Sequence, residues 1–211
     1  MIIKLPEYGE HICFAGTTGS GKTYLAERML SKLDNYFVID TQDGMNVPGV
    51  KIDTPTGLKW KLWMFKKIRY VPKPEYLNKQ AWEMVFKQIL QSSSKKKQNK
   101  RIIYIDEIYH VGYGVNFPSW LPKAITTARQ RKLSFWISTQ RPSQIPLPIL
   151  SECSRIFAFY LGYEEDIKKL SKFNRKGDLK EAIMACKFDY SFIEIDRAKG
   201  NYVKHNKLAG G

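Results

Sequence analysis

The chain has few cysteines and histidines and no long apolar run. Its three cysteines, Cys13, Cys153 and Cys186, are far apart, and no Cys-x-x-Cys pair is present. We therefore expect reduced core cysteines rather than a disulfide framework or a cysteine metal site. The three histidines are scattered singly without metal-ligand spacing, which indicates structural or surface roles.

An apolar run of about 18 residues is also missing, so we expect no transmembrane helix. The segment Met1–Pro6 has neither the apolar core nor the cleavage site of a signal peptide. Both observations favour an intracellular protein.

Acidic residues are scarce relative to basic ones. The 35 Lys and Arg outnumber the 20 Asp and Glu and give a net charge of +15, while 43 % hydrophobic residues are enough for a packed core. Such an excess suggests a polyanionic partner, with nucleic acid first and an anionic membrane surface second. A general solubility charge is the remaining alternative.

A glycine-rich stretch carries the clearest chemistry. It fits the P-loop pattern G-x-x-x-x-G-K-[ST] with the residues Gly16, Thr17, Thr18, Gly19, Ser20, Gly21, Lys22 and Thr23. The apolar Ile12–Ala15 before it predicts a buried strand, and Tyr24–Leu33 after it has helical periodicity. Glycines let the backbone wrap the phosphates of ATP, Lys22 would reach the β- and γ-phosphates, and the Thr23 hydroxyl would bind Mg²⁺.

Two further strands end in polar side chains. Ile102–Ile105 leads into Asp106 and Glu107, which after a P-loop is the Walker B pattern. Asp106 would hold Mg²⁺ and Glu107 would polarise the attacking water, although solvated acids at a strand end are the alternative. Gln140 follows the apolar strand Phe135–Thr139 and would lie near the γ-phosphate; an ordinary strand end is again the alternative.

Strands and helices alternate along the sequence, which predicts an α/β fold with a mostly parallel central sheet flanked by helices. The expected strands are His11–Ala15, Tyr36–Asp40, Lys67–Val71, Arg101–Asp106, Ser134–Thr139, Arg155–Phe159 and Phe188–Ile195. The expected helices are Lys22–Leu33, Asn78–Gln91, Ser119–Arg129, Glu164–Ser171 and Asp178–Met184. We expect a single domain over residues 1–206 with an antiparallel hairpin turning near Gly200, and a frayed tail over 207–211.

These motifs together resemble the FtsK/HerA superfamily of DNA-pumping ATPases. The resemblance covers roughly residues 10 to 160, and the Ala128–Arg131 turn followed by Ser138–Ser143 is its most specific part. It implies an additional-strand, catalytic-glutamate P-loop fold that acts as a homo-oligomeric ring, usually a hexamer, on double-stranded DNA. In the family, an arginine at the position of Arg129 is the trans-acting finger; Arg131 is kept as the alternative.

The chain departs from the cellular members of that superfamily. From the sequence we expect no N-terminal β-barrel, membrane spans or winged helix, and the chain looks most like the genome-packaging ATPases of membrane-containing icosahedral viruses, including archaeal ones. This resemblance implies capsid or membrane-vertex partners and action in the cytoplasm of the infected host cell or at the virion vertex. A reduced cellular translocase, a P-loop small-molecule kinase and a nucleic-acid-binding module with a degenerate nucleotide switch remain alternatives.

Three segments are candidates for contact with DNA phosphates. Lys59–Lys67 interleaves basic and aromatic residues, although packing in the core with snorkelling lysines is the favoured alternative. The Lys95–Lys97 and Lys100–Arg101 cluster is the second candidate, with a solvated loop as its alternative. The Tyr109–Gly114 loop after the Walker B acids is the third, because its position would couple hydrolysis to movement.

Overall fold

The predicted alternation of strands and helices is present in the computed structural model, which describes residues 3–93, 100–111, 117–175, 177–187 and 189–207. The strands are β1 (His11–Ala15), β2 (Tyr36–Asp40), β3 (Val50–Ile52), β4 (Lys67–Tyr70), β5 (Arg101–Asp106), β6 (Leu133–Thr139), β7 (Cys153–Ala158), β8 (Phe192–Asp196) and β9 (Asn201–His205). The α-helices are α1 (Lys22–Leu30), α2 (Leu58–Met64), α3 (Lys79–Ser92), α4 (Ile108–Val111), α5 (Trp120–Gln130), α6 (Leu147–Glu152), α7 (Glu164–Ser171) and α8 (Leu179–Met184).

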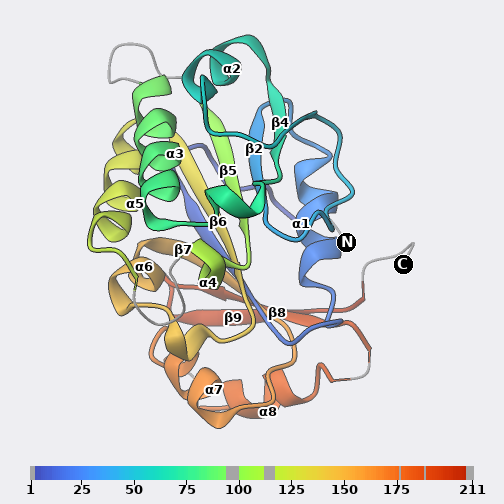
Figure 1. The fold of residues 1–211 in the computed structure, drawn as a ribbon. Helices are drawn as coiled ribbons and strands as arrows, with labels where there is room; N and C mark the ends of the chain where they lie inside the picture. Colours follow the sequence, from blue (N-terminus) through green and yellow to red (C-terminus); the bar gives the residue numbers. More distant parts are fainter. Residues whose placement is uncertain (1–2, 94–99, 112–116, 176, 188, 208–211) are drawn as a thin grey trace.

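In the described part of the chain, the strands form one nine-stranded sheet in the order β3-β4-β2-β5-β6-β1-β7-β8-β9. Pairs from β3 to β7 are parallel, and the pairs β7–β8 and β8–β9 are antiparallel. The predicted α/β fold with a C-terminal antiparallel hairpin is therefore confirmed, with Gly200 at φ +62° in its turn. Figure 1 shows the sheet running between α1 on one side and α3 and α5 on the other.

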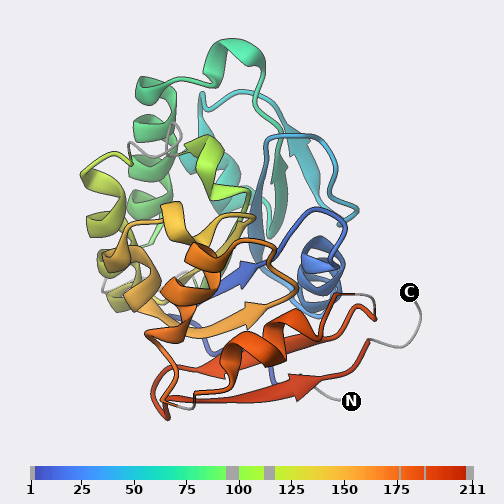
Figure 2. The same ribbon diagram turned by 90° about the horizontal axis from the view of Figure 1, so that it is seen from below.

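The two faces of the sheet are covered unequally. One hydrophobic cluster packs α2 to α8 against the sheet, and a second packs α1 with the N-terminal segment around Ile3 on the opposite face. β1 and β2 are buried at every residue, as parallel strands covered on both sides should be. Figure 2, turned by 90°, shows α7, α8 and the β8–β9 hairpin gathered at one end of the molecule.

Several boundaries differ from the expectation for a physical reason. α1 ends at Leu30 instead of Leu33, because Lys32 and Leu33 donate to carbonyls only three residues back. β8 begins at Phe192 because Tyr190 has φ +53° and Ser191 folds back onto the Asp189 carboxylate, so the chain is not extended there. Residue 188 of the expected strand and residues 208–211 of the expected tail lie outside the described residues.

One histidine and all three cysteines are buried in the structure. His11 is 1 % exposed; its Nδ1 accepts from the Phe135 N–H at 2.8 Å, and burial lowers the pKa of His11 to about 4. His11 is thus a neutral structural residue. Cys13, Cys153 and Cys186 are free and buried, as expected. No helix within the described ranges is long and apolar enough to cross a membrane.

Candidate nucleotide-hydrolysis site

The glycine-rich loop Gly16–Thr23 joins β1 to α1 and is fixed between the two strands that flank β1. The Gly16 N–H donates to the Thr139 carbonyl of β6 at 3.1 Å, and the Thr17 N–H donates to the Tyr160 carbonyl just after β7 at 3.0 Å. Gly16 has no room for a side chain, because an added Cβ would lie 2.6 Å from the Phe159 Cβ. Gly19 and Gly21 have φ of +74° and +103°, which only glycine adopts readily. Backbone geometry thus requires the glycines of this loop.

Lys22 and Thr23 begin α1 at the centre of the site. Lys22 is 7 % exposed, and its Nζ donates to the Thr17 carbonyl at 2.9 Å. Burial lowers the pKa of the Lys22 ammonium, while the Glu107 and Asp106 carboxylates act in the opposite direction. The buried Ser20 Oγ has no hydrogen-bond partner among the described residues. A buried hydroxyl of this kind costs free energy unless a ligand satisfies it, and phosphate oxygens are suitable acceptors.

The carboxyl ends of β5 and β2 bring two acids together. Asp106 ends β5, stands beside Asp40 of β2 in the sheet register, and accepts from the Tyr104 hydroxyl at 3.2 Å. Burial raises the pKa of Asp106, and the Asp40 carboxylate raises it further. A cation at this point would relieve that repulsion. Since the described residues contain no group of three or more His, Cys, Asp or Glu placed to hold a metal ion, a hard cation would need phosphate oxygens and water to complete its ligands.

Glu107 follows Asp106 in a left-handed conformation, with φ +53°. A residue other than glycine adopts this conformation at a cost of roughly 1–2 kcal/mol, so the surrounding structure imposes it. Burial raises the pKa of Glu107 to about 7, while Lys22 and hydrogen bonds from the backbone and side chain of Gln140 act to lower it. Glu107 is therefore a half-buried carboxyl next to the predicted metal ligand, with a proton affinity suited to exchange near neutral pH.

Gln140 lies just beyond the end of β6 and connects the two motifs. Its Oε1 accepts from the Thr18 hydroxyl at 2.9 Å, and the same residue hydrogen-bonds Glu107. The structure therefore brings Lys22, Asp106, Glu107 and Gln140 to one edge of the sheet, where parallel strands present ligand sites.

Arg129 lies at the opposite end of the strands from this site, where the parallel strands begin. It is exposed in the last turn of α5, close enough to His11 at the start of β1 to affect its pKa, whereas the P-loop follows the end of β1. Arg131 is held by backbone groups of its own chain: its guanidinium donates to the Leu90 and Ser93 carbonyls. Of the two arginines, Arg129 is thus the one presented to solvent.

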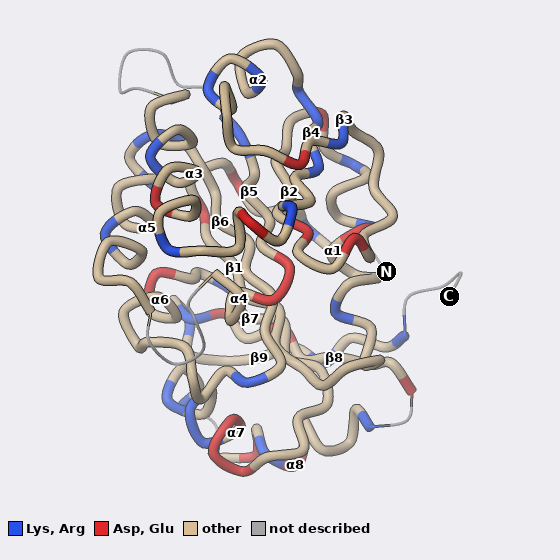
Figure 3. Tube along the Cα trace, in the orientation of Figure 1, with Lys and Arg blue, Asp and Glu red and all other residues tan. Residues whose placement is uncertain are grey.

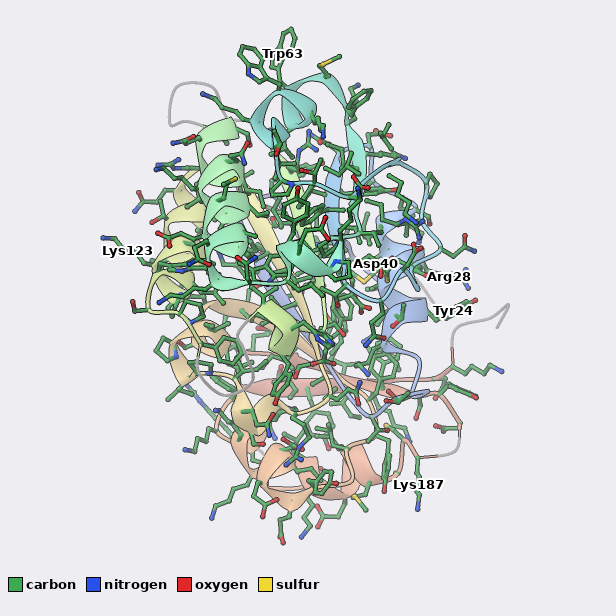
Figure 4. The ribbon with its side chains drawn as sticks, viewed as in Figure 1. Tyr24, Arg28, Asp40, Trp63, Lys123 and Lys187 are labelled. Atoms are coloured by element: carbon green, nitrogen blue, oxygen red, sulfur yellow. The ribbon has the colours of Figure 1, made fainter. Side chains whose placement is uncertain are left out.

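The sequence pattern did not identify two residues that support the site, Asp40 and Arg141. Asp40 is fully buried and accepts from the Gly44 and Met45 N–H groups at 3.0 and 2.9 Å. The sequence feature that could have identified Asp40 is an acid at the end of the apolar strand Tyr36–Asp40, as in the Walker B strand. Figure 4 labels Asp40 in the interior of the molecule.

Arg141 is the second contribution that was missed, and it anchors the segment after Gln140. Its Nε donates to the buried Asp166 carboxylate at 2.9 Å, and its guanidinium lies 3.9 Å from the centre of the Tyr163 ring. Asp166 also accepts from the Ser143 N–H at 2.8 Å. No local signal in the sequence pairs Arg141 with Asp166, which lies on α7.

The structure places the candidate DNA-contacting segments differently. Leu58 and Leu62 of α2 are buried, but Trp60 and Trp63 are 69 % and 72 % exposed. The expectation that this segment packs in the core is therefore wrong for both tryptophans. Figure 4 shows Trp63 projecting from the tip of α2. Arg101 is 4 % exposed and donates to carbonyls of α2 and the residue that follows it, so its assignment to a DNA-contacting cluster is wrong. Residues 95–97 and 112–114 lie outside the described residues.

A family model described as an AAA domain matches residues 7–142, a range that includes the P-loop, the Asp106–Glu107 pair and Gln140. The chain belongs to this AAA domain family. It therefore carries an AAA-type P-loop ATPase domain. None of the curated proteins compared with this AAA domain is significantly similar to it in sequence.

Solved structures with the same fold include viral and bacterial ATPases. The genome packaging NTPase B204 from Sulfolobus turreted icosahedral virus 2, in complex with sulfate, has a TM-score of 0.75 at 17 % identity, over 99 % of this chain and 100 % of that one. The DNA-packaging ATPase B204 from Sulfolobus turreted icosahedral virus has 0.71 at 19 %, over 96 % and 100 %. VirB4 of Thermoanaerobacter pseudethanolicus has 0.67 at 9 %, over 95 % and 90 %. The resemblance to packaging ATPases is thus confirmed at the level of the fold.

Proposed function

We propose that this AAA domain is an ATP-hydrolysing motor that translocates double-stranded DNA, and that its task is to package a viral genome into a preformed capsid. The observation that carries the proposal is the position of Glu107, held between Lys22, Asp106 and Gln140 at the carboxyl edge of the sheet. A carboxyl with this pKa and these neighbours suits activation of water. A cellular HerA/FtsK-like translocase would use the same chemistry and is the alternative.

Each residue of the nucleotide site has a separate role in hydrolysis. Lys22 and the P-loop amides bind the β- and γ-phosphates, and Glu107 takes the proton of the attacking water while Gln140 orients it. Thr23 and Asp106 offer the hard oxygen ligands that suit Mg²⁺, and a bound Mg²⁺ would offset the negative charge of the phosphates. Asp40 lies beside Asp106 in the sheet and holds the Gly44–Met45 turn by accepting hydrogen bonds from its two N–H groups.

A ring explains the position of Arg129. Because its own nucleotide site is at the opposite edge of the sheet, an exposed Arg129 can meet only a nucleotide held by a neighbouring subunit. A head-to-tail interface between identical subunits closes into a ring when the rotation allows it, and we propose a hexamer. Each site would then combine Lys22 and Glu107 of one subunit with Arg129 of the next.

The surplus of basic residues supports duplex DNA as the substrate that moves. Figure 3 shows Lys and Arg on α2, α3, α5 and α7 rather than in one stripe. Exposed Lys59 and Lys66 flank the exposed tryptophans of α2. Contacts of this kind go to phosphates, since a motor must move over any sequence. Capsid or vertex proteins would be the remaining partners.

Analysis of the reaction products tests the proposal against its competitors. We expect free phosphate from ATP without any acceptor, at a rate that duplex DNA raises and that falls steeply as salt increases. Phosphate transferred only to a small molecule would identify a kinase instead. Tight ATP binding with negligible turnover, with or without DNA, would identify a degenerate switch.

A further inference from the structure

Helix α2 carries apolar side chains on both its inner and its outer face. Leu58 and Leu62 are buried in the core, whereas Trp60, Trp63 and Met64 are each more than half exposed, Met64 at 63 %. A surface helix ordinarily presents polar residues to water, and adjoining exposed apolar side chains mark an interaction surface. The function proposed above gives these three apolar side chains no role.

The spacing of the three side chains places them together. At about 100° per residue, Trp60, Trp63 and Met64 fall within an arc of about 100° on the outer side of α2. Lys59 and Lys61 fall on the two sides of that arc. We call Trp60, Trp63 and Met64 the tryptophan face; Figure 4 shows Trp63 projecting from the molecule at this point.

Hydrogen bonds at both ends of α2 keep the tryptophan face turned outward. At the start, the Lys59 N–H donates to the Gln88 Oε1 of α3 at 3.0 Å, and the Gln88 Nε2 donates to the Pro55 carbonyl at 2.9 Å. At the end, the buried Arg101 guanidinium donates to the Leu62 carbonyl at 2.7 Å. Rolling the tryptophans into the core would break these bonds, so only a partner can cover them.

The charge around the tryptophan face has one sign. No Asp or Glu occurs between Thr54 and Pro74. Within the described part of the chain, Lys59, Lys61 and Lys66 take part in no ion pair. A second copy of the same face would bring like charges together, which is unfavourable. The partner that fits is anionic and also accepts apolar side chains.

The lysines alone suit the phosphates of either DNA or lipid, and the tryptophans decide between them. Duplex DNA keeps its bases stacked, and apolar wedges that enter it kink the duplex, which does not suit a motor that slides. A bilayer accepts both kinds of side chain: tryptophan rings lie at the level of the headgroups, and lysine stems lie along the apolar surface with the ammonium in water. The lysines of α3, α5 and α7 remain available to the duplex.

We propose that α2 binds the surface of an anionic lipid bilayer, with Trp60 and Trp63 in the headgroup region and Lys59 and Lys66 on the lipid phosphates. α2 has seven residues, far fewer than the roughly 20 that cross a bilayer, so it lies in the interface. The binding requires neither ATP nor DNA and is therefore independent of the proposed motor function.

The test compares wild type with the double variant Trp60→Ala/Trp63→Ala by co-sedimentation with vesicles of phosphatidylcholine containing about one third phosphatidylserine. We expect the double variant to bind at least about tenfold more weakly, because two aromatic side chains no longer leave water. Its melting temperature should equal that of wild type, since both side chains are exposed. Met184→Ala is the matched control: Met184 is 41 % exposed on α8, at the other end of the molecule (Figure 1), and its loss should leave binding unchanged.

The lysine contribution has its own measurement. We expect Lys59→Gln to weaken binding to the anionic vesicles by about fivefold and to leave binding to pure phosphatidylcholine unchanged. The wild-type difference between the two kinds of vesicle should shrink as salt is raised.

Tryptophan fluorescence gives a second readout on the wild-type protein. Of the five tryptophans, Trp82 and Trp136 are buried, while Trp60 and Trp63 are largely exposed. We expect anionic vesicles to shift the emission to shorter wavelength, and lipids brominated on their acyl chains to quench it. Met184→Ala should show the same shift and quenching as wild type.

Three outcomes would overturn the inference. The first is vesicle binding by Trp60→Ala/Trp63→Ala equal to that of wild type. The second is loss of duplex DNA binding by that variant with vesicle binding intact, which would make the tryptophan face a DNA surface. The third is a change in oligomeric state of that variant without any vesicle binding by wild type, which would make the face an interface between copies of the chain.

Discussion

Replacing Glu107 with Gln is expected to lower kcat for ATP hydrolysis by about 10²- to 10⁴-fold, because the amide cannot take the proton of the attacking water. ATP binding should persist, since the Lys22 ammonium and the P-loop remain and one carboxylate near the phosphates has been neutralised. Single-turnover phosphate release gives the chemical step, and calorimetry with Mg²⁺ and ATP gives the affinity. The two measurements together separate a lost base from a lost binding site.

Glu83→Gln is the matched control, because Glu83 is an exposed acid on α3 and should leave hydrolysis unchanged. If Glu107→Gln hydrolyses ATP at the wild-type rate, then Glu107 is not the base, and Asp40 or Asp106 becomes the candidate. Loss of ATP binding together with hydrolysis would mean that the substitution disturbs the left-handed turn at Glu107.

Replacing Arg129 with Ala is expected to lower hydrolysis by about 10³- to 10⁵-fold in the assembled ring, the magnitude typical of an arginine finger. ATP binding by the separate subunit should not change, because Arg129 lies at the opposite edge of the sheet from its own P-loop. Mixing Arg129→Ala subunits with Glu107→Gln subunits should restore part of the activity, since some interfaces then pair an intact Glu107 with an intact Arg129.

Lys123→Ala is the control for Arg129, because Lys123 is an exposed cation on the same helix and projects outward (Figure 4). Arg131→Ala should instead lower the free energy of unfolding, by about 1–3 kcal/mol, because Arg131 satisfies the Leu90 and Ser93 carbonyls. Normal hydrolysis by assembled Arg129→Ala rings, or no recovery on mixing, would contradict the trans assignment.

Local patterns were enough to locate the residues of both phosphate-binding motifs. Gly16–Thr23 and Asp106–Glu107 follow apolar strands whose bounds the structure reproduces, because a buried strand between turn residues is a strong local signal. The sequence pattern did not indicate the short strand β3 or the short helix α2. β3 spans only Val50–Ile52, and α2 buries just Leu58 and Leu62 while its tryptophans face solvent.

Contacts between distant segments could not be predicted from the sequence. Asp40 and Asp106 become neighbours only through the pairing of β2 with β5. Arg101 is buried because the carbonyls of Leu62 and Phe65 happen to face it, which no charge count reveals. Tyr24 and Tyr190 line one cavity although most of the chain separates them, since the C-terminal hairpin returns to the P-loop only in three dimensions.

Displacement of a third strand from a duplex tests the central claim most directly. In this assay a DNA triplex is mixed with the protein, Mg²⁺ and ATP, and release of the third strand reports movement along the duplex. The account predicts release that requires ATP hydrolysis, works on any duplex sequence and disappears with Glu107→Gln. Duplex binding and rapid ATP hydrolysis by wild-type protein without any strand release would contradict it.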